Sequence, residues 1–208
     1  MRKEWNMLKL DKSDFVGKGL HRECYRHPDN IALCVKVVVT GNDDETRRER
    51  KYYRHLEKRN ISWEMIPRYY GDIETNLGLG SVFDLIIDGT GVVAKTLEYY
   101  LTSPETTRAH SAGLAHALAA LKEYLLAHRI ITMTLKPKNI VYTQEDATEP
   151  RLVIIDNIGN SDFIPVCNYS NFFARKKIFR KWKQFEASML DTYPHNTALQ
   201  QLLATLSG

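Results

Sequence analysis

Two short apolar segments in the second half of the chain constrain its fold more than any other feature. They are NIVYT (139–143) and RLVIID (151–156), and a polar stretch that contains proline separates them. Such segments on either side of turn-forming residues are typical of paired strands, so the sequence predicts a short β-hairpin. Asn139 begins the first segment and Asp156 ends the second. Side-chain oxygens of this kind suit hard cations such as Mg²⁺, so we expect both residues to be metal ligands.

The first half of the chain is predicted to be rich in β-structure. Residues 7–39 and 66–88 alternate apolar runs with turn residues, and NLGLG (76–80) is the expected turn within the second stretch. Between these stretches, residues 43–60 are highly charged and carry a narrow apolar stripe, which predicts a helix. The stripe consists of Tyr52, Tyr53 and Leu56.

The second half is predicted to be mainly helical. Ser103 is a suitable N-cap with Pro104 at the first helical position, and leucines follow at helical spacing, which predicts a buried central helix. Residues 171–206 predict two further helices. With a boundary near residues 89–91, the expected fold class is α+β, with a small antiparallel β part followed by a helical part. The leucines are Leu114, Leu118, Leu121 and Leu125.

Composition limits the class of protein. The 208 residues are 43% hydrophobic and 26% charged, with a net charge of +4, which are ordinary values for a globular chain. No run approaches the roughly 18 apolar residues that span a bilayer, and the first residues lack the apolar core of a secretion signal. We therefore expect a cytoplasmic protein without a transmembrane segment. The three cysteines are widely spaced and no H-E-x-x-H pattern occurs, which indicates reduced thiols and no structural zinc.

One segment near the end of the sequence holds the surplus of positive charge. In residues 171–189 six cations face a single acid, an excess larger than that of the whole chain, so we expect no DNA binding by the remainder. This segment either packs as a helix with its cations in water, or uses interleaved aromatic and basic residues to bind anionic lipid headgroups or nucleic-acid phosphates. The residues predicted to share one broad face are Phe172, Lys176, Phe179 and Lys183, and the other cations are Arg175, Lys177, Arg180 and Lys181.

Three residues of the first half are candidates for phosphate binding. Gly17 and Gly19 lie between two expected strands, where the absence of side chains lets backbone N–H groups approach phosphates, although ordinary hairpin glycines give the same pattern. Lys36 is a charge inside the apolar strand LCVKVVV. Its burial is costly unless the ammonium reaches a partner or extends past the edge of the sheet into water. A nucleotide phosphate is the partner that we predict.

Two further elements complete a candidate nucleotide site. Glu49, on the charged helix, is expected to pair with Lys36, and Glu45 is a competing candidate on the same helix. The segment FDLII (83–87) is expected to end a strand, where the backbone of Asp84 and Ile86 is exposed to hydrogen-bond an adenine ring.

The order of these elements resembles the protein-kinase-like fold. TLKPKNIVY (134–142) is similar to the L-K-P-x-N-I core of the kinase catalytic loop. IIDNIG stands where the metal-binding D-F-G belongs, with the Asp kept, the Phe replaced and a residue inserted before Gly159. The resemblance implies a single domain of two lobes, over about residues 7–88 and 89–206, that binds ATP and Mg²⁺ in the cleft between them. It places Lys136 near the transferred phosphoryl group.

A closer resemblance extends over roughly residues 10–185. The segments GKGLHRECYRHP, RRERKYYRHL, IPRYYG, ITMTLKPKNIV and DNIG together are similar to the PhoP regulatory network protein YrbL family of enterobacteria and relatives. This resemblance implies a stress-related regulatory role connected with a two-component system that responds to magnesium and acid. The acceptor substrate and any protein partner stay open.

One departure from the kinase pattern bears on catalysis. Thr134 occupies the place of the catalytic aspartate, and a threonine hydroxyl cannot accept a proton usefully near neutral pH. A general base contributes about 10²- to 10⁴-fold to a rate, so nucleotide binding is easier to defend than turnover. We expect an atypical phosphotransferase, for example one whose substrate brings its own nucleophile of low pKa. The alternative is a catalytically inactive pseudokinase that acts as an interaction module.

Overall fold

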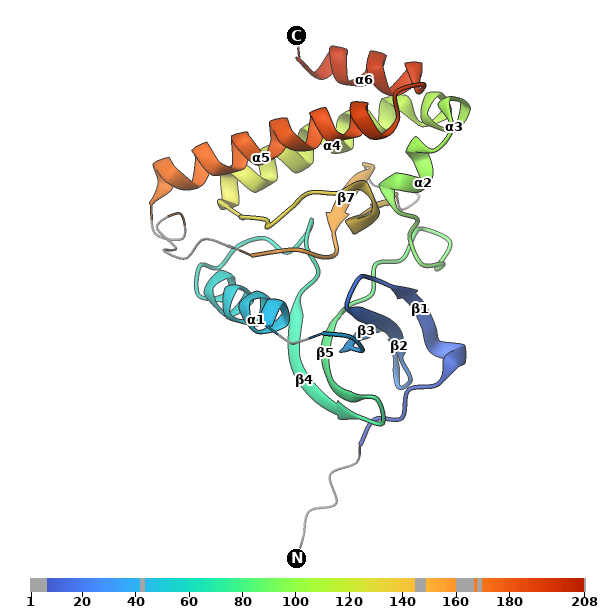
Figure 1. The fold of residues 1–208 in the computed structure, drawn as a ribbon, viewed down its shortest axis with the longest axis vertical. Coiled ribbons are helices and arrows are strands. Elements are labelled where there is room, and N and C mark those ends of the chain that lie inside the picture. The colour runs from blue at the N-terminus through green and yellow to red at the C-terminus, as the bar shows by residue number, and fades with distance from the viewer. Residues whose placement is uncertain (1–6, 42–43, 145–148, 160–166, 168–169, 208) are drawn as a thin grey trace, which may run out of the picture. The chain divides into compact units, whose positions relative to one another are not determined.

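The computed structural model describes residues 7–41, 44–144, 149–159, 167 and 170–207. It is a mixed α+β structure with an antiparallel sheet and several helices, so the expected α+β class is confirmed (Figure 1). Internal contacts divide the chain into two compact units. The first, here called the sheet unit, comprises Met1–Arg47 and Pro67–Ile86, and the second, here called the helical unit, comprises Arg48–Ile66 and Ile87–Gly208.

The sheet unit contains five strands in the order β1-β2-β3-β5-β4, and every neighbouring pair is antiparallel. The expectation of strands from residue 7 onward is wrong for residues 7–14. There Leu8 makes a single bridge to Thr75, and Asp11 caps a short 3₁₀ helix, η1 (Lys12–Asp14), by accepting the N–H of Ser13. The strands are β1 (Phe15–Lys18), β2 (Arg22–His27), β3 (Asn30–Val38), β4 (Tyr69–Thr75) and β5 (Gly78–Asp84).

The turn between β4 and β5 is shorter than the sequence suggests. Gly78, Leu79 and Gly80 belong to β5 rather than to the turn. Gly80 is needed inside the strand because a Cβ at this position would lie 2.4 Å from Cγ1 of the fully buried Val35. The glycine thus permits close packing in the sheet, where a local pattern suggests only a turn.

Helix α1 (Asp44–Glu57) begins in the sheet unit and continues, from Arg48, in the helical unit. Its predicted apolar stripe of Tyr52, Tyr53 and Leu56 is buried. The ring of Tyr53 stacks on that of Trp63, with centroids 6.0 Å apart. The hydroxyl of Tyr52 accepts the backbone N–H of Ile131 at 2.7 Å. Most of α1 is therefore fixed to the segment that leads into TLKPKN.

We expect Tyr52→Phe to destabilise the protein by about 1–3 kcal/mol, because the N–H of Ile131 would lose its acceptor in a buried place. Burial also raises the pKa of Tyr52 to about 12, so the stabilising contribution is complete below the unfolded pKa near 10 and is lost as the pH rises through about 12. Denaturant unfolding at neutral pH measures the change. Tyr99→Phe, at an exposed tyrosine, is the control, and equal effects of the two substitutions would contradict the prediction.

The leucine stripe predicted for the central helix is confirmed, but the helix is interrupted. Ser103 caps α3 (Pro104–Ala109), and His110, with φ −111° and ψ 10°, then separates it from α4 (Ser111–His128). The Nδ2 of the buried Asn196 donates to the carbonyl of Leu101 and to the hydroxyl of Thr107. These bonds join Leu101 and α3 to a distant part of the chain. All four leucines of the stripe are buried in α4.

The remaining elements of the helical unit follow the sequence closely. The hairpin exists as β6 (Ile140–Thr143) and β7 (Arg151–Ile154), and Ile140 pairs with Ile154. Helix α4 packs on β7, and α5 and α6 pack on α4 (Figure 1). None of the helices in the described part of the chain has the length and apolar character to cross a membrane. The other helices are α2 (Leu97–Leu101), η2 (Pro137–Asn139), α5 (Asn171–Thr192) and α6 (Thr197–Ser207).

Candidate functional site

The TLKPKN loop and the DNIG segment lie side by side in the helical unit. Thr132 forms an antiparallel bridge with Ile158. On either side of this bridge, the N–H of Met133 donates to the carbonyl of Asn157 at 2.8 Å, and the N–H of Gly159 donates to the carbonyl of Ile131 at 2.9 Å. Two segments that are more than twenty residues apart in sequence are thereby held in a fixed register.

The β6–β7 hairpin places the two predicted metal ligands at the same end. The backbone N–H of Ile155 donates to the carbonyl of Asn139 at 2.9 Å, so this pair continues the hairpin register by one step. Asp156 is the next residue along the chain, and both Asn139 and Asp156 are half-buried. One oxygen of the Asp156 carboxylate accepts the N–H of Asn157 at 2.9 Å. A residue with a side-chain amide and a residue with a carboxylate therefore lie at the same end of the hairpin.

Asn157 is a site residue that the sequence reasoning missed. Its backbone has φ 63°, in the left-handed region that asparagine tolerates better than most residues. From this position its side-chain Nδ2 donates to the hydroxyl oxygen of the exposed Thr134 at 3.1 Å. The only signal in the sequence is that an asparagine stands where the D-F-G pattern has an aromatic residue. Lys136 is also exposed, two residues after Thr134.

In the sheet unit, Lys36 and Gly17 lie in one row across three strands. Gly17 pairs with Cys24, and Cys24 pairs with Lys36, so their side-chain positions share one face of the sheet. Lys36 is half-buried, and its ammonium lies 4.7 Å from the ring centroid of Phe83 on the same face. A Cβ at Gly17 would meet no atom within 4 Å, so this end of the row is open. The N–H of Gly19 is used inside the turn, where it donates to the carbonyl of Arg22 at 2.8 Å.

The two positions proposed for adenine differ in their backbone. The N–H of Asp84 donates to the carbonyl of Arg68, and the carbonyl of Asp84 accepts the thiol of Cys34 at 3.6 Å. The Asp84 carboxylate accepts the N–H of Arg68 and the hydroxyl of Tyr70. Within the residues that the structure describes, no backbone hydrogen bond is made by the N–H of Ile86. Ile86 is therefore better suited than Asp84 to offer its backbone to a ligand.

Burial distinguishes the two acidic candidates on α1. Glu49 is 2% exposed, whereas Glu45 is exposed to solvent. A carboxyl group that is almost completely buried needs a partner, so Glu49 is the residue of the two whose position requires one. The predicted site residues therefore fall into two sets. Gly17, Gly19, Lys36, Asp84 and Ile86 belong to the sheet unit, and Glu49, Thr134, Lys136, Asn139 and Asp156 belong to the helical unit.

All three cysteines lie within the described residues. Cys24, Cys34 and Cys167 are free thiols. A hydrogen bond with Cys24, together with burial, raises the pKa of the Cys34 thiol well above its usual value, so this thiol stays protonated. Across the described residues there is no group of three or more His, Cys, Asp or Glu side chains that could hold a metal. The proposed metal ligands, Asn139 and Asp156, are only two residues and one of them is an amide, so they do not form a group of this type.

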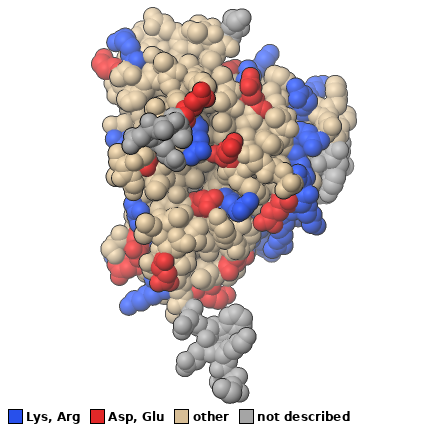
Figure 2. All heavy atoms as spheres, turned by 180° about the vertical axis from the view of Figure 1, so that it is seen from behind, with Lys and Arg blue, Asp and Glu red and all other residues tan. Residues whose placement is uncertain are grey.

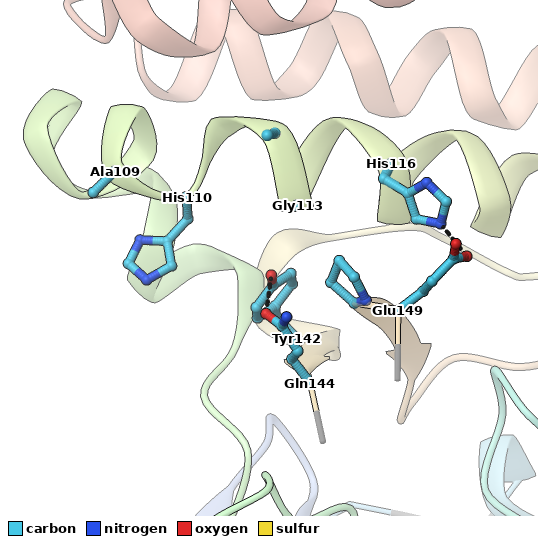
Figure 3. Close-up of a pocket in the computed structure, with 9 residues that line it drawn as sticks. Ala109, His110, Gly113, His116, Tyr142, Gln144 and Glu149 are labelled. Carbon is cyan, nitrogen blue, oxygen red and sulfur yellow. Dashed lines mark hydrogen bonds and ion pairs between the residues drawn. The ribbon is translucent and has the colours of Figure 1, made fainter. Parts of the chain in front are cut away.

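A cavity that the sequence did not indicate lies between α3, the start of α4 and the ends of the β6–β7 hairpin (Figure 3). Its volume of about 410 Å³ is in the range of small-molecule pockets. On its wall, His116 pairs with Glu149 at 2.9 Å, and a Cβ at Gly113 would lie 2.4 Å from the hydroxyl of Tyr142. Gly113 thus makes room for the tyrosine. None of the predicted site residues lines this cavity.

Comparison with known proteins gives a consistent family relationship. The profile described as PhoP regulatory network protein YrbL matches residues 8–190. The chain is 41% identical over 186 residues to a protein of Escherichia coli strain K12 described as "Uncharacterized protein YrbL", and to the protein of the same description from Shigella flexneri. Each alignment covers 87% of both chains.

Proposed function

The chain belongs to the PhoP regulatory network protein YrbL family, and we propose that it binds ATP with Mg²⁺. In this proposal Asn139 and Asp156 bind the metal, Lys36 binds phosphate with Gly17 and Gly19 beside it, and Ile86 offers its backbone to the adenine. Glu49 supports the charge of the lysine, and Lys136 contacts the terminal phosphate. The family description supports a regulatory role for this binding in a PhoP-linked network.

The observation that supports the proposal best is the position of Asn139 and Asp156 at one end of the β6–β7 hairpin. Asn139 directly precedes β6, Asp156 closely follows β7, and the hydrogen bond between Ile155 and Asn139 links the backbone at this end. Mg²⁺ needs oxygen ligands in a nearly octahedral arrangement and usually takes one or two from the protein, with water and phosphate oxygens completing the set. Asn139 and Asp156 are both half-buried and carry oxygen atoms, and two is the number of protein ligands that Mg²⁺ usually takes.

The TLKPKN loop also favours nucleotide binding rather than rapid phosphoryl transfer. Kinase chemistry depends mostly on positioning and on neutralisation of phosphate charge, which Lys36, Lys136 and the metal ligands would supply. The proton of an acceptor hydroxyl, however, needs a base, and Thr134 has none to offer. The hydroxyl of Thr134 is instead held by the amide of Asn157. We therefore propose slow or atypical phosphoryl transfer, and a regulatory module without chemistry is the alternative function.

Thermal unfolding with and without Mg·ATP tests the proposal. A ligand that binds the folded state raises the melting temperature. We expect this rise in the wild-type protein and a much smaller one in Lys36→Ala, because loss of a charged hydrogen bond weakens binding by roughly 10- to 100-fold. Lys12→Ala, at an exposed lysine of the same unit, should behave as wild type. An equal rise in all three proteins would remove Lys36 from the site, and no rise in any of them would contradict ATP binding.

A further inference from the structure

Helix α5 has a buried face that explains how it is held in the helical unit. Ala174, Ile178, Trp182, Phe185 and Met189 recur at helical spacing and are all buried, and the helix contacts α4 and α6. The Nε1 of Trp182 donates to the carboxylate of Glu186 at 2.5 Å. Lys177 also lies on this side and is only 5% exposed. The structure thus shows that Lys177 is buried and is not available to a partner at the surface.

The opposite face of α5 combines cations with exposed aromatic rings. Phe172 is 70% exposed, Phe173 is 49% exposed and Phe179 is 42% exposed. Lys176, Arg180 and Lys183 are exposed between and beyond them. At 3.6 residues per turn, these positions all point away from the buried face. We call this surface, formed by Phe172, Phe173, Lys176, Phe179, Arg180 and Lys183, the Phe–Lys face.

The charge of the Phe–Lys face is not balanced locally. Between Asn171 and Gln184 the helix contains no acidic residue. Throughout the described part of the chain, Lys176, Arg180 and Lys183 have neither an ion pair nor a side-chain hydrogen bond. In Figure 2, Lys and Arg side chains gather along one edge of the view, whereas both signs of charge are mixed over the rest of it. A free positive surface with apolar rings attracts a partner that is both anionic and able to accept apolar groups.

We propose that the Phe–Lys face binds the anionic surface of a lipid bilayer. Cations attract acidic headgroups, and phenylalanine rings bury their apolar area at the boundary between headgroups and acyl chains. The exposed side of a single helix can lie flat on such a surface, and along this helix the cations alternate with the rings. Nucleic acid shares the phosphate chemistry and its bases can stack on aromatic rings, but such sites usually follow the strand along a basic groove, whereas these rings lie on the outer face of one helix. This inference does not depend on nucleotide binding.

Sedimentation with lipid vesicles tests the proposal on the full-length protein. We expect binding to phosphatidylcholine vesicles that contain about one third phosphatidylglycerol, and weak binding to pure phosphatidylcholine. Combined reversal of the three cations, Lys176→Glu, Arg180→Glu and Lys183→Glu, should weaken binding to the anionic vesicles at least about ten-fold. Combined Phe172→Ser, Phe173→Ser and Phe179→Ser should weaken it to a similar extent at unchanged net charge, about ten-fold.

The matched control reverses three exposed cations on α1, with Arg48→Glu, Lys51→Glu and Arg54→Glu. These substitutions change the net charge by the same amount as the triple reversal on α5, but on a helix face without exposed aromatic rings. It should keep most of the binding. Equal loss in the two charge-reversed proteins would show unspecific attraction and would overturn the proposal. So would tight binding of a single-stranded oligonucleotide with no vesicle binding. The single substitutions Lys176→Glu and Phe179→Ser, each expected to weaken binding measurably, keep the test decisive if a triple variant does not fold.

Discussion

Replacing Asp156 with alanine is expected to abolish the part of ATP-dependent stabilisation that requires Mg²⁺. Asp156 is the charged member of the proposed metal pair, and an amide oxygen alone binds Mg²⁺ too weakly to hold the ion. At a ligand concentration about 100 times the dissociation constant, bound ligand stabilises a protein by about 2.7 kcal/mol, and this is the amount at stake. Melting temperatures measured with ATP, with and without Mg²⁺, give the result.

Two variants make the outcome of this experiment specific. Asp156→Asn keeps an acceptor for the N–H of Asn157 while it removes the charge, so it separates loss of metal binding from loss of local structure. Asp191→Ala, at an exposed aspartate in the last turn of α5, should leave the Mg²⁺-dependent shift intact. A shift in both Asp156 variants equal to that of the wild-type protein would rule out Asp156 as a ligand.

The same variants separate the two functional alternatives. Transfer of the γ-phosphate, or attachment of AMP, should be measured under excess Mg²⁺ for the wild-type protein and for Asp156→Ala. Equal background in both, combined with intact Mg·ATP binding by the wild-type protein, would favour a regulatory module without chemistry. Transfer by the wild-type protein alone would show that the loop with Thr134 supports a slow reaction without an aspartate base.

Leu121→Ala is expected to cause the largest loss of stability, about 2–5 kcal/mol, because it opens a cavity in a helix that is packed on several sides. Leu121 is completely buried in α4, which contacts β7, α5 and α6. Denaturant unfolding should show a lower midpoint with an unchanged slope. The matched control is Leu190→Ala on α5, where the leucine is 39% exposed and its loss should cost much less. Similar losses in the two variants would contradict the assigned core.

Much of the local structure could be predicted because it depends on short-range periodicity. Three features have a physical cause that lies within a few residues of the chain. They are the leucine stripe of α4, the Ser103 cap and the β6–β7 hairpin. Predictions failed where a distant group was the cause. Gly80 was expected in a turn, but it lies within β5, where Val35 of another strand leaves no room for a side chain.

In the candidate site, too, residue types could be predicted from local sequence, whereas contacts between distant residues could not. Asn139 and Asp156 indicated metal binding because their oxygens suit hard cations, and Lys36 indicated phosphate binding because a charge inside an apolar strand is costly unless it has a partner. Which neighbours they have could not be derived in this way. The hydrogen bond from Asn157 to Thr134 depends on a left-handed backbone position, and the preference for Glu49 over Glu45 depends on burial.

The sequence by itself determined the order of strands and helices, the residues able to face a core and the family to which the chain belongs, because periodicity and local motifs are carried by neighbouring residues. Only the tertiary structure decided which face of α5 is covered, which of its cations stay in water, and that Asn139 and Asp156 share one end of a hairpin. Those outcomes depend on packing and hydrogen bonds between distant segments, and their energies are set by the residues that the fold brings together.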